Sequence, residues 1–551
     1  MPRITAPSGS TLSVAAGLAG AAIVTALLTG ASSTRFQHDL DQAGPPLSLQ
    51  PAFSPPSSAT TTNPGDLPPR RLSQRVVLVI LDGLREDASH GQPFLDSLRA
   101  RGTSGSARAA FPSLSLPGYT SILTGAPPRW SGVRSNSYDH AVPLDSIVAR
   151  VRSAGGRAVF VGDHGRSVPR LLPDFADATL APWSRGLERS LITALERPAD
   201  LVVVLWSGID DAGHDHGAAS PAYRAAVGSA DRALARALAS LDPRTDTILV
   251  VADHGHIASG GHGGTEPEVL AVPLLLAGAG VRRGGSLDHP MLTDVAPTVA
   301  ALLGLPAPGH ALGRTQTGAL ALGARERAAR ARLDHDRQTA LLPALHAAEA
   351  QARRAATRGR ALRWLALALA LAAALAGLAW ATRQGLLRLD RRVVAASLAT
   401  VPVLLFALLA SCDRSLLSPS LLPHPESLLR KLLPYVALAI TIQAALAWYA
   451  AARRRSPRGR LAAASGAAAL GLLVALLPAA VVWAMVGGDS AYTACAPVLN
   501  LLSPLCNGAA CLAAAVASAV LGLETVIYLA RSSVFVTGSS PGQDRAASDV
   551  V

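Results

Sequence analysis

Long apolar runs at the two ends of the chain constrain its fold more than any other feature. They cover residues 11–30, 362–381, 393–411, 432–451, 461–486 and 508–530. A helix of about 20 apolar residues is long enough to cross the hydrocarbon core of a bilayer. We therefore predict an α-helical transmembrane region of five helices over residues 361–531, and a further apolar segment that enters the membrane at the N-terminus.

The segments that border these runs are polar or low in complexity. The run at 11–30 is either a cleaved signal peptide or an uncleaved anchor, and its length favours a signal anchor over residues 1–31. Residues 32–72 are rich in Pro, Ser and Thr, a composition that cannot bury enough apolar surface to fold, so they are predicted to be a flexible linker. Residues 319–360 are predicted to be a solvated helical connector, and residues 532–551 a cytoplasmic tail.

Arginines concentrate in two loops of the C-terminal region. Four follow the first of its apolar runs and five follow the third, among them Arg391, Arg392 and Arg453, whereas residues 487–507 contain none. Positively charged loops usually remain in the cytoplasm. Both termini are therefore predicted to be cytoplasmic and residues 73–318 to lie outside the cytoplasm, in an integral protein of the plasma membrane. Because this topology accounts for many basic residues within the net charge of +13, no nucleic-acid partner is expected.

Residues 73–318 alternate short apolar runs with helical stretches. The apolar runs are 76–81, 158–161, 201–206, 247–252 and 274–277. Strands that are apolar throughout are buried on both faces, which is typical of an α/β fold with a mostly parallel sheet between helices. Ligands of such sheets bind at the carboxyl ends of the strands, where the polar side chains of this segment gather.

Carboxylate and imidazole side chains follow three of these strands. They are Asp82 after the first, Asp210 and His214 after the third, and Asp253, His254 and His262 after the fourth. Asp215 and His216 compete as ligands beside His214. Oxygen and nitrogen ligands of this kind suit zinc, with Mn²⁺ as the alternative, and all four cysteines lie in the C-terminal apolar third. Because three strand ends carry such groups independently, we predict a site for two metal ions.

Four motifs occur in an order that resembles the alkaline-phosphatase superfamily, in the branch of nucleotide pyrophosphatase/phosphodiesterases and GPI ethanolamine phosphate transferases. They are LDGLR (81–85), FPSLSLPGY (111–119), the segment 209–217 and DHG (253–255), with TDVAPT (293–298) similar to the segment that closes this domain. The resemblance covers about residues 75–315. It implies an alkaline-phosphatase-like sandwich and a catalytic domain over residues 73–318.

The same resemblance implies a role for each candidate residue. One zinc ion would be held by Asp82, Asp253, His254 and Ser115, and the other by Asp210, His214 and His262. The nucleophile of this family lies two residues before a proline, here Pro117, which assigns Ser115 and leaves Ser113 as the alternative. Asn136 would donate its amide to a phosphoryl oxygen.

These roles imply a membrane-anchored, metal-dependent phosphodiesterase or phosphoethanolamine-type transferase that works through a phosphoseryl intermediate outside the cytoplasm. Its substrate would be a phosphodiester or a lipid-linked phosphate. One alternative is a catalytically inactive, phosphatase-like scaffold protein. Another is a sulfatase-like hydrolase, which needs an arginine four residues after the nucleophile, where this chain has Tyr119. A second Asp-His-Gly triplet begins at Asp163 and is interpreted as a loop, because it lacks the Gly-His-Gly sequence that follows Asp253.

Overall fold

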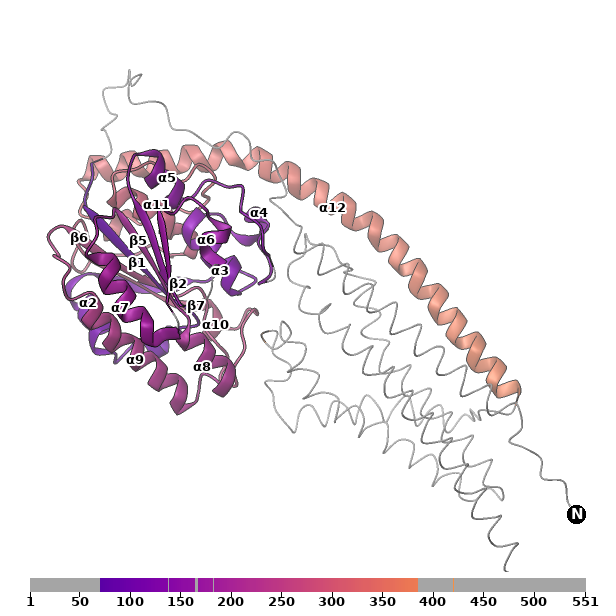
Figure 1. Ribbon diagram of the computed structural model, residues 1–551. Coiled ribbons are helices and arrows are strands. Elements are labelled where there is room, and N and C mark those ends of the chain that lie inside the picture. The colour runs from indigo at the N-terminus through magenta and orange to yellow at the C-terminus, as the bar shows by residue number, and fades with distance from the viewer. Residues whose placement is uncertain (1–69, 137, 164–166, 182, 385–419, 421–551) are drawn as a thin grey trace, which may run out of the picture.

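The computed structural model describes residues 70–384 and Ser420, apart from residues 137, 164–166 and 182 (Figure 1). The predicted signal anchor, almost all of the predicted linker, four of the five C-terminal apolar runs and the predicted tail lie outside the described residues. The structure therefore does not test those predictions.

A single mixed sheet of seven strands forms the centre of the described domain, in the order β2-β7-β6-β1-β5-β3-β4. The strands are β1 (Arg75–Leu81), β2 (Thr103–Arg108), β3 (Ala158–Gly162), β4 (Asp177–Leu180), β5 (Leu201–Trp206), β6 (Asp246–Val251) and β7 (Ala271–Gly278). The strands from β6 to β4 are parallel to one another, whereas β7 runs antiparallel to both β6 and β2. The predicted α/β class with a mostly parallel sheet is confirmed.

Helices cover both faces of this sheet (Figure 1). They are α2 (Pro93–Arg101), α3 (Ser115–Thr124), α4 (Pro128–Ser131), α5 (Ile147–Ser153), α6 (Ser167–Leu171), α7 (Trp183–Leu195), α8 (Gly208–His216), α9 (Pro221–Ala237), α10 (Pro267–Leu270), α11 (Val295–Leu302) and α12 (Ala324–Arg383), with 3₁₀ turns at η2 (Asp87–Ser89), η3 (Leu292–Asp294) and η4 (Thr317–Ala319). Helices α2, α7 and α8 contact α9, and α3 and α5 contact α11. Between the helices, β1 and β5 are buried along almost their whole length, which is why their sequences are apolar at every position.

Two strands that the apolar pattern did not predict, β2 and β4, lie at the edges of the sheet. Their sequences, TSGSAR and DATL, are polar or mixed. An edge strand pairs on one side only and is partly solvated, so it needs no continuous apolar run. Neither edge strand therefore contains an apolar run that would reveal it in the sequence.

The predicted connector (319–360) is helical from Ala324 onward. We expected it to be solvated, but its first part, up to Leu345, packs against the domain. Leu341 and Leu345 belong to the hydrophobic core of the domain. The buried Arg337 donates from Nε to the Ala311 carbonyl at 2.8 Å and pairs with Asp334 at 2.8 Å. This part of α12 thus belongs to the domain. Its leucines pack into the hydrophobic core, and its buried arginine bonds to the backbone of the domain.

Replacing Arg337 by leucine should therefore destabilise the whole domain. The change leaves Asp334 buried without its cation and frees two carbonyl acceptors, which costs roughly 3 kcal/mol in the free energy of unfolding. Chemical denaturation of the full chain in detergent measures the effect. Arg332→Leu on the exposed face of α12 is the matched control and should stay within about 0.5 kcal/mol; equal effects of the two variants would contradict this account.

The later part of α12 coincides with the apolar run predicted at 362–381. Trp364–Arg383 is 20 residues long with a mean hydropathy of 2.1, and only 6% of its most apolar stretch is buried. By length and composition it could cross a membrane, and among the described residues it is the one helix that could. The five-helix transmembrane region as a whole stays a prediction.

Candidate active site

The three central strands β6, β1 and β5 are neighbours and run parallel, so their carboxyl ends meet at one edge of the sheet. Asp82 directly follows β1, α8 follows β5, and the segment that begins at Ala252 follows β6. Helix α3 begins at Ser115 beside them. The candidate active site consists of Asp82, Ser115, Asp210, His214, Asp253, His254 and His262.

Three of the predicted ligand atoms surround a fourth, Nε2 of His254. This nitrogen lies 3.4 Å from Asp82 Oδ1, 3.3 Å from Asp253 Oδ2 and 3.4 Å from Ser115 Oγ. Ligands placed tetrahedrally about 2.0–2.2 Å from a zinc ion are roughly 3.3–3.6 Å apart. The observed separations match that spacing.

Two of these atoms are otherwise unsatisfied. Among the described residues, Asp82 Oδ1 and Asp253 Oδ2 are buried carboxylate oxygens without a hydrogen-bond partner. Burying such an oxygen is unfavourable unless a donor or a cation compensates for it. A divalent cation among these four atoms would supply that compensation, so the residues fit a bound metal.

The other predicted set lies directly beside the first. His214 Nε2 is 3.4 Å from Asp210 Oδ2 and 3.0 Å from His262 Nε2, and His262 Nε2 is 3.6 Å from Asp210 Oδ1. The rings of His254 and His262 stack with their centroids 3.7 Å apart, which joins the two sets. An Asp with two imidazoles is a donor set that favours zinc.

Backbone carbonyls orient the two stacked imidazoles toward the site. His254 Nδ1 lies 3.2 Å from the Gly255 carbonyl oxygen, and His262 Nδ1 lies 3.0 Å from that of Ser113. A carbonyl only accepts, so each Nδ1 carries the hydrogen and each Nε2 presents a lone pair to the site. Both rings are therefore in the tautomer that a metal ligand requires.

The two candidate serines differ in what their hydroxyls contact. Ser113 is buried, and its hydroxyl donates to the Gly264 carbonyl at 2.8 Å and accepts from the Gly263 amide at 3.1 Å. Ser115 points at the cluster of ligand atoms and is the first residue of α3. The geometry favours Ser115 as nucleophile and gives Ser113 a structural contact with the glycine loop.

A glycine on α3 permits this approach of Ser115. A Cβ on Gly118 would lie 2.7 Å from Cβ of Asp253, closer than two carbon atoms can pack. The missing side chain lets the first turn of α3 contact the loop after β6. Ser115 is thereby held next to the carboxylates.

Asn136 is placed to donate a hydrogen bond to a ligand beside Ser115. Its Oδ1 accepts from the Leu116 backbone amide at 3.1 Å, and its side chain is exposed. The oxygen is thus occupied within the first turn of α3, which leaves the NH₂ group for a ligand. The predicted contact with a phosphoryl oxygen stays a prediction.

Burial dominates the electrostatics of the cluster. It raises the pKa of Asp253 to about 8, with the charge of Asp210 adding to the effect, and it raises the pKa of Asp82 well above its ordinary range, where Asp253 adds. Burial also lowers the pKa of His254 to about 3. Asp210 is the exception, because hydrogen bonds from His214 and His256 outweigh its burial and hold its pKa well below the ordinary value. At neutral pH the metal-free cluster therefore holds a neutral imidazole at His254 and a protonated carboxyl at Asp253, whereas Asp210 stays ionised.

Metal affinity should consequently rise with pH. A metal ion must displace the proton that the raised pKa of Asp253 retains below about 8. We expect the apparent affinity of the metal-stripped chain to increase about tenfold per pH unit from about pH 6 and to level off above about pH 8. Chelator competition at several pH values measures this, and a flat profile below about pH 8 would contradict the raised pKa.

The sequence did not predict two contacts of the cluster. The Tyr119 hydroxyl donates to Asp82 Oδ2, which gives this residue a role that the motif left open. His256 is fully buried, and its Nε2 lies 2.8 Å from Asp210 Oδ1. The signal for His256 was its place two residues after His254, in the same strand-end motif.

The residues that competed with the predicted set lie elsewhere. Asp215 and His216 are exposed at the end of α8, and none of the candidate metal-binding groups among the described residues includes them. Asp163 Oδ1 accepts from the Ser207 amide at 2.9 Å and so joins the ends of β3 and β5, as expected for a loop residue. Its neighbours 164 and 165 lie outside the described residues.

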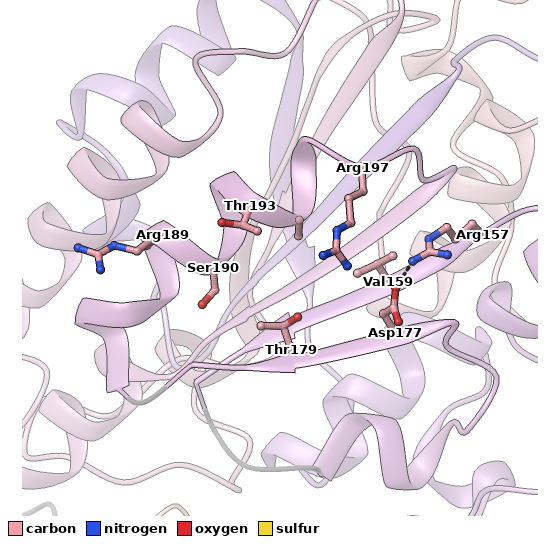
Figure 2. A pocket seen from close by; sticks show the side chains of 9 residues that line it. Arg157, Val159, Asp177, Thr179, Arg189, Ser190, Thr193 and Arg197 are labelled. Atoms are coloured by element: carbon pink, nitrogen blue, oxygen red, sulfur yellow. Dashed lines mark hydrogen bonds and ion pairs between the residues drawn. The ribbon is translucent and has the colours of Figure 1, made fainter.

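A separate hollow of about 230 Å³ lies between α7 and the strands β3 and β4, near one edge of the sheet (Figure 2). Arg157, Arg189 and Arg197 line it, and Arg157 pairs with Asp177. Val159 and Asp177, which also line it, pair at the start of the two strands, so the hollow is at the opposite end of the sheet from the candidate active site. It contributes nothing to that site.

Comparison with known proteins agrees with this geometry. Residues 76–149 and 142–263 match the family described as type I phosphodiesterase / nucleotide pyrophosphatase, and every residue of the candidate active site lies within them. The matched segment, residues 76–263, belongs to the alkaline-phosphatase superfamily. Its branch is that of the nucleotide pyrophosphatase/phosphodiesterases and the GPI ethanolamine phosphate transferases.

Individual proteins that are similar to the chain differ in their named activities. The chain is 29% identical to human GPI ethanolamine phosphate transferase 2, catalytic subunit, over 51% of this chain and 30% of the relative. It is also 29% identical to the 2,3-bisphosphoglycerate-independent phosphoglycerate mutase of Roseobacter denitrificans, over 38% of this chain and 48% of the relative. A solved structure of murine ectonucleotide pyrophosphatase/phosphodiesterase 5 with AMP is similar at 14% identity and a TM-score of 0.38, over 43% of this chain and 96% of that one. The matched segments thus span less than half of either curated relative.

Proposed function

We propose that this protein is a membrane-anchored phosphodiesterase or phosphoethanolamine-type transferase that uses two zinc ions and forms a phosphoseryl intermediate on Ser115. One observation carries the proposal: Ser115 Oγ lies in the same cluster as an imidazole nitrogen and two unsatisfied carboxylate oxygens. A hydroxyl in that position is placed for activation as a nucleophile.

The residues of the site divide the reaction between them. Zinc bound at the two ligand sets would lower the pKa of the Ser115 hydroxyl and neutralise charge on the departing oxygen. Ser115 Oγ then gives up its proton to solvent and attacks phosphorus. A new P–O bond forms as the bond to the leaving oxygen breaks, the departing oxygen takes up a proton as an alcohol, and the phosphoryl group stays on Ser115. The Asn136 NH₂ group donates to a non-bridging oxygen, and the N-terminus of α3 favours the negative charge there.

The second half of the reaction decides between hydrolase and transferase. Water or an acceptor alcohol attacks the phosphorus from the opposite side, the bond to Ser115 Oγ breaks, and the serine regains its proton. The names of the curated relatives support an alcohol acceptor. We place the reaction outside the cytoplasm, at the plasma membrane, on a phosphodiester or lipid-linked phosphate, from the distribution of arginines around the apolar runs.

The alternative functions have less support. An inactive scaffold would be expected to have lost ligands, yet all seven residues of the site are present and converge. A sulfatase would need an arginine where the chain has Tyr119, which is buried and donates to Asp82. Both observations favour phosphoryl transfer.

The test uses the full-length, zinc-loaded chain in detergent with three substrates: p-nitrophenyl phosphate, bis-p-nitrophenyl phosphate and phosphatidylethanolamine labelled in its headgroup. We expect turnover of the diester or of the lipid above that of the monoester, abolished by a chelator and restored by zinc. Acid quenching followed by peptide mass spectrometry should find the adduct on Ser115. Zinc-independent turnover, or an adduct on another residue, would refute the proposal.

A further inference from the structure

His256 occupies a closed position beside the second ligand set. It is 0% exposed, and its Nε2 lies 2.8 Å from Asp210 Oδ1. On the other side of the ring, the backbone amide of Gly261 points at Nδ1 from 3.1 Å. His256, Asp210 and His214 form a group that could hold a metal ion. His256 could therefore be a metal ligand itself or a residue that orients the ligand Asp210.

The backbone decides which ring nitrogen of His256 carries the hydrogen. The Gly261 amide can only donate, so Nδ1 must accept and is bare. The hydrogen of the ring is therefore on Nε2, where it is donated to the Asp210 carboxylate. A nitrogen that carries a hydrogen has no lone pair for a metal ion.

This arrangement is the reverse of that at the two stacked imidazoles. His254 and His262 each face a backbone carbonyl with Nδ1, which leaves Nε2 bare and directed at the site. His256 faces a backbone amide with the same atom. The backbone partners thus give the three histidines two different tautomers. His254 and His262 can bind a metal through Nε2, whereas His256 can donate a hydrogen bond from Nε2.

Glycines on the other two strand-end segments make room for the His256 ring. A Cβ on Gly213 would lie 2.5 Å from Nε2 of His256, and a Cβ on Gly83 would lie 2.9 Å from it. Neither glycine could carry a side chain without displacing the imidazole. The glycine of LDGLR and the glycine of α8 thus form a closed slot for this one ring.

We propose that His256 is a positioning residue, which donates Nε2–H to Oδ1 of Asp210 and thereby fixes the orientation of this carboxylate, with Oδ2 directed toward His214. Asp210 Oδ2 is the atom that lies 3.4 Å from His214 Nε2. Hydrogen bonds from behind a ligating carboxylate fix its orientation and strengthen the metal site. The inference rests on the proposed two-zinc function and adds a supporting residue to it.

The test compares two replacements of His256 in the full-length chain. Glutamine can present an amide N–H near the position of Nε2, whereas methionine has similar bulk and no donor. We expect His256→Met to weaken zinc binding at one of the two sites about 10- to 100-fold by chelator competition, and His256→Gln to stay within about threefold of the wild type. The cobalt-substituted absorption spectrum of His256→Gln should match that of the wild type.

Other outcomes overturn the inference in different ways. Equal loss of one metal in both variants, with a changed cobalt spectrum, would make His256 a ligand. Unchanged zinc binding in both would make it a packing residue. A wild-type chain that binds no zinc would refute the proposed function as well, whereas a wild-type chain that binds two zinc ions without turnover would refute that function alone.

A spectroscopic measurement on the wild-type chain tests the tautomer of His256 directly, with His256→Gln used only to assign the signal. In ¹⁵N-histidine-labelled protein, the signal that His256→Gln eliminates should show a protonated Nε2 and a bare Nδ1. If that signal shows a protonated Nδ1, the hydrogen bond to Asp210 cannot exist and the inference fails.

Discussion

Replacing Ser115 by alanine should lower the rate of phosphoryl transfer by at least about 1,000-fold. The change removes the oxygen that lies 3.4 Å from His254 Nε2 and forms the bond to phosphorus, while both carboxylates of that ligand set remain. Steady-state turnover of the best of the three substrates, at saturating zinc, measures the loss. The variant should still bind two zinc ions and show no adduct after acid quenching.

Ser113→Ala is the matched control, two residues away in the same motif. Its hydroxyl is engaged with the loop at Gly263 and Gly264, so its loss should reduce stability by about 1–3 kcal/mol and leave turnover within about tenfold of the wild type. If Ser113→Ala is inactive while Ser115→Ala turns over, the nucleophile is Ser113 and the mechanism proposed here is wrong.

Replacing Asp253 by asparagine should have opposite effects on function and on the stability of the metal-free chain. It removes one ligand oxygen, so zinc binding at that set should weaken by at least about 100-fold and turnover should fall with it. The metal-free protein should become more stable by roughly 1–3 kcal/mol at neutral pH. The gain arises because the folded state no longer has to hold a proton on a buried carboxyl whose pKa is about 8.

The sign of the stability effect follows from that raised pKa. A carboxyl with a raised pKa favours folding at low pH and loses this contribution as pH rises toward about 8. The advantage of Asp253→Asn should therefore grow with pH in metal-free thermal unfolding and vanish in acid. Asp246→Asn, at the opposite end of β6, is the control and should leave zinc binding unchanged. A destabilised metal-free Asp253→Asn protein would contradict the account of the cluster.

The sequence by itself determined the central strands and the order of the motifs. Every strand that is apolar along its length was predicted, because burial on both faces leaves its mark on each residue, as in β1 and β5. The sequence also predicted that the candidate metal-binding side chains gather at one edge of the sheet. They come in the segments that follow such strands, and parallel strands end at the same edge. Those features are local in the chain, and their consequences in space follow from the geometry of the sheet.

The tertiary structure alone decided what depends on contacts between distant segments. The edge strands β2 and β4 have polar sequences that only pairing reveals, and the buried face of α12 depends on carbonyls such as that of Ala311. Ser113 was set apart from Ser115 by a glycine loop about 150 residues further along the chain. The direction of the His256 hydrogen bond depends on a single backbone amide, that of Gly261. Residue type and spacing identify a group that can bind or donate, but the partner it meets in the fold decides which of the two it does.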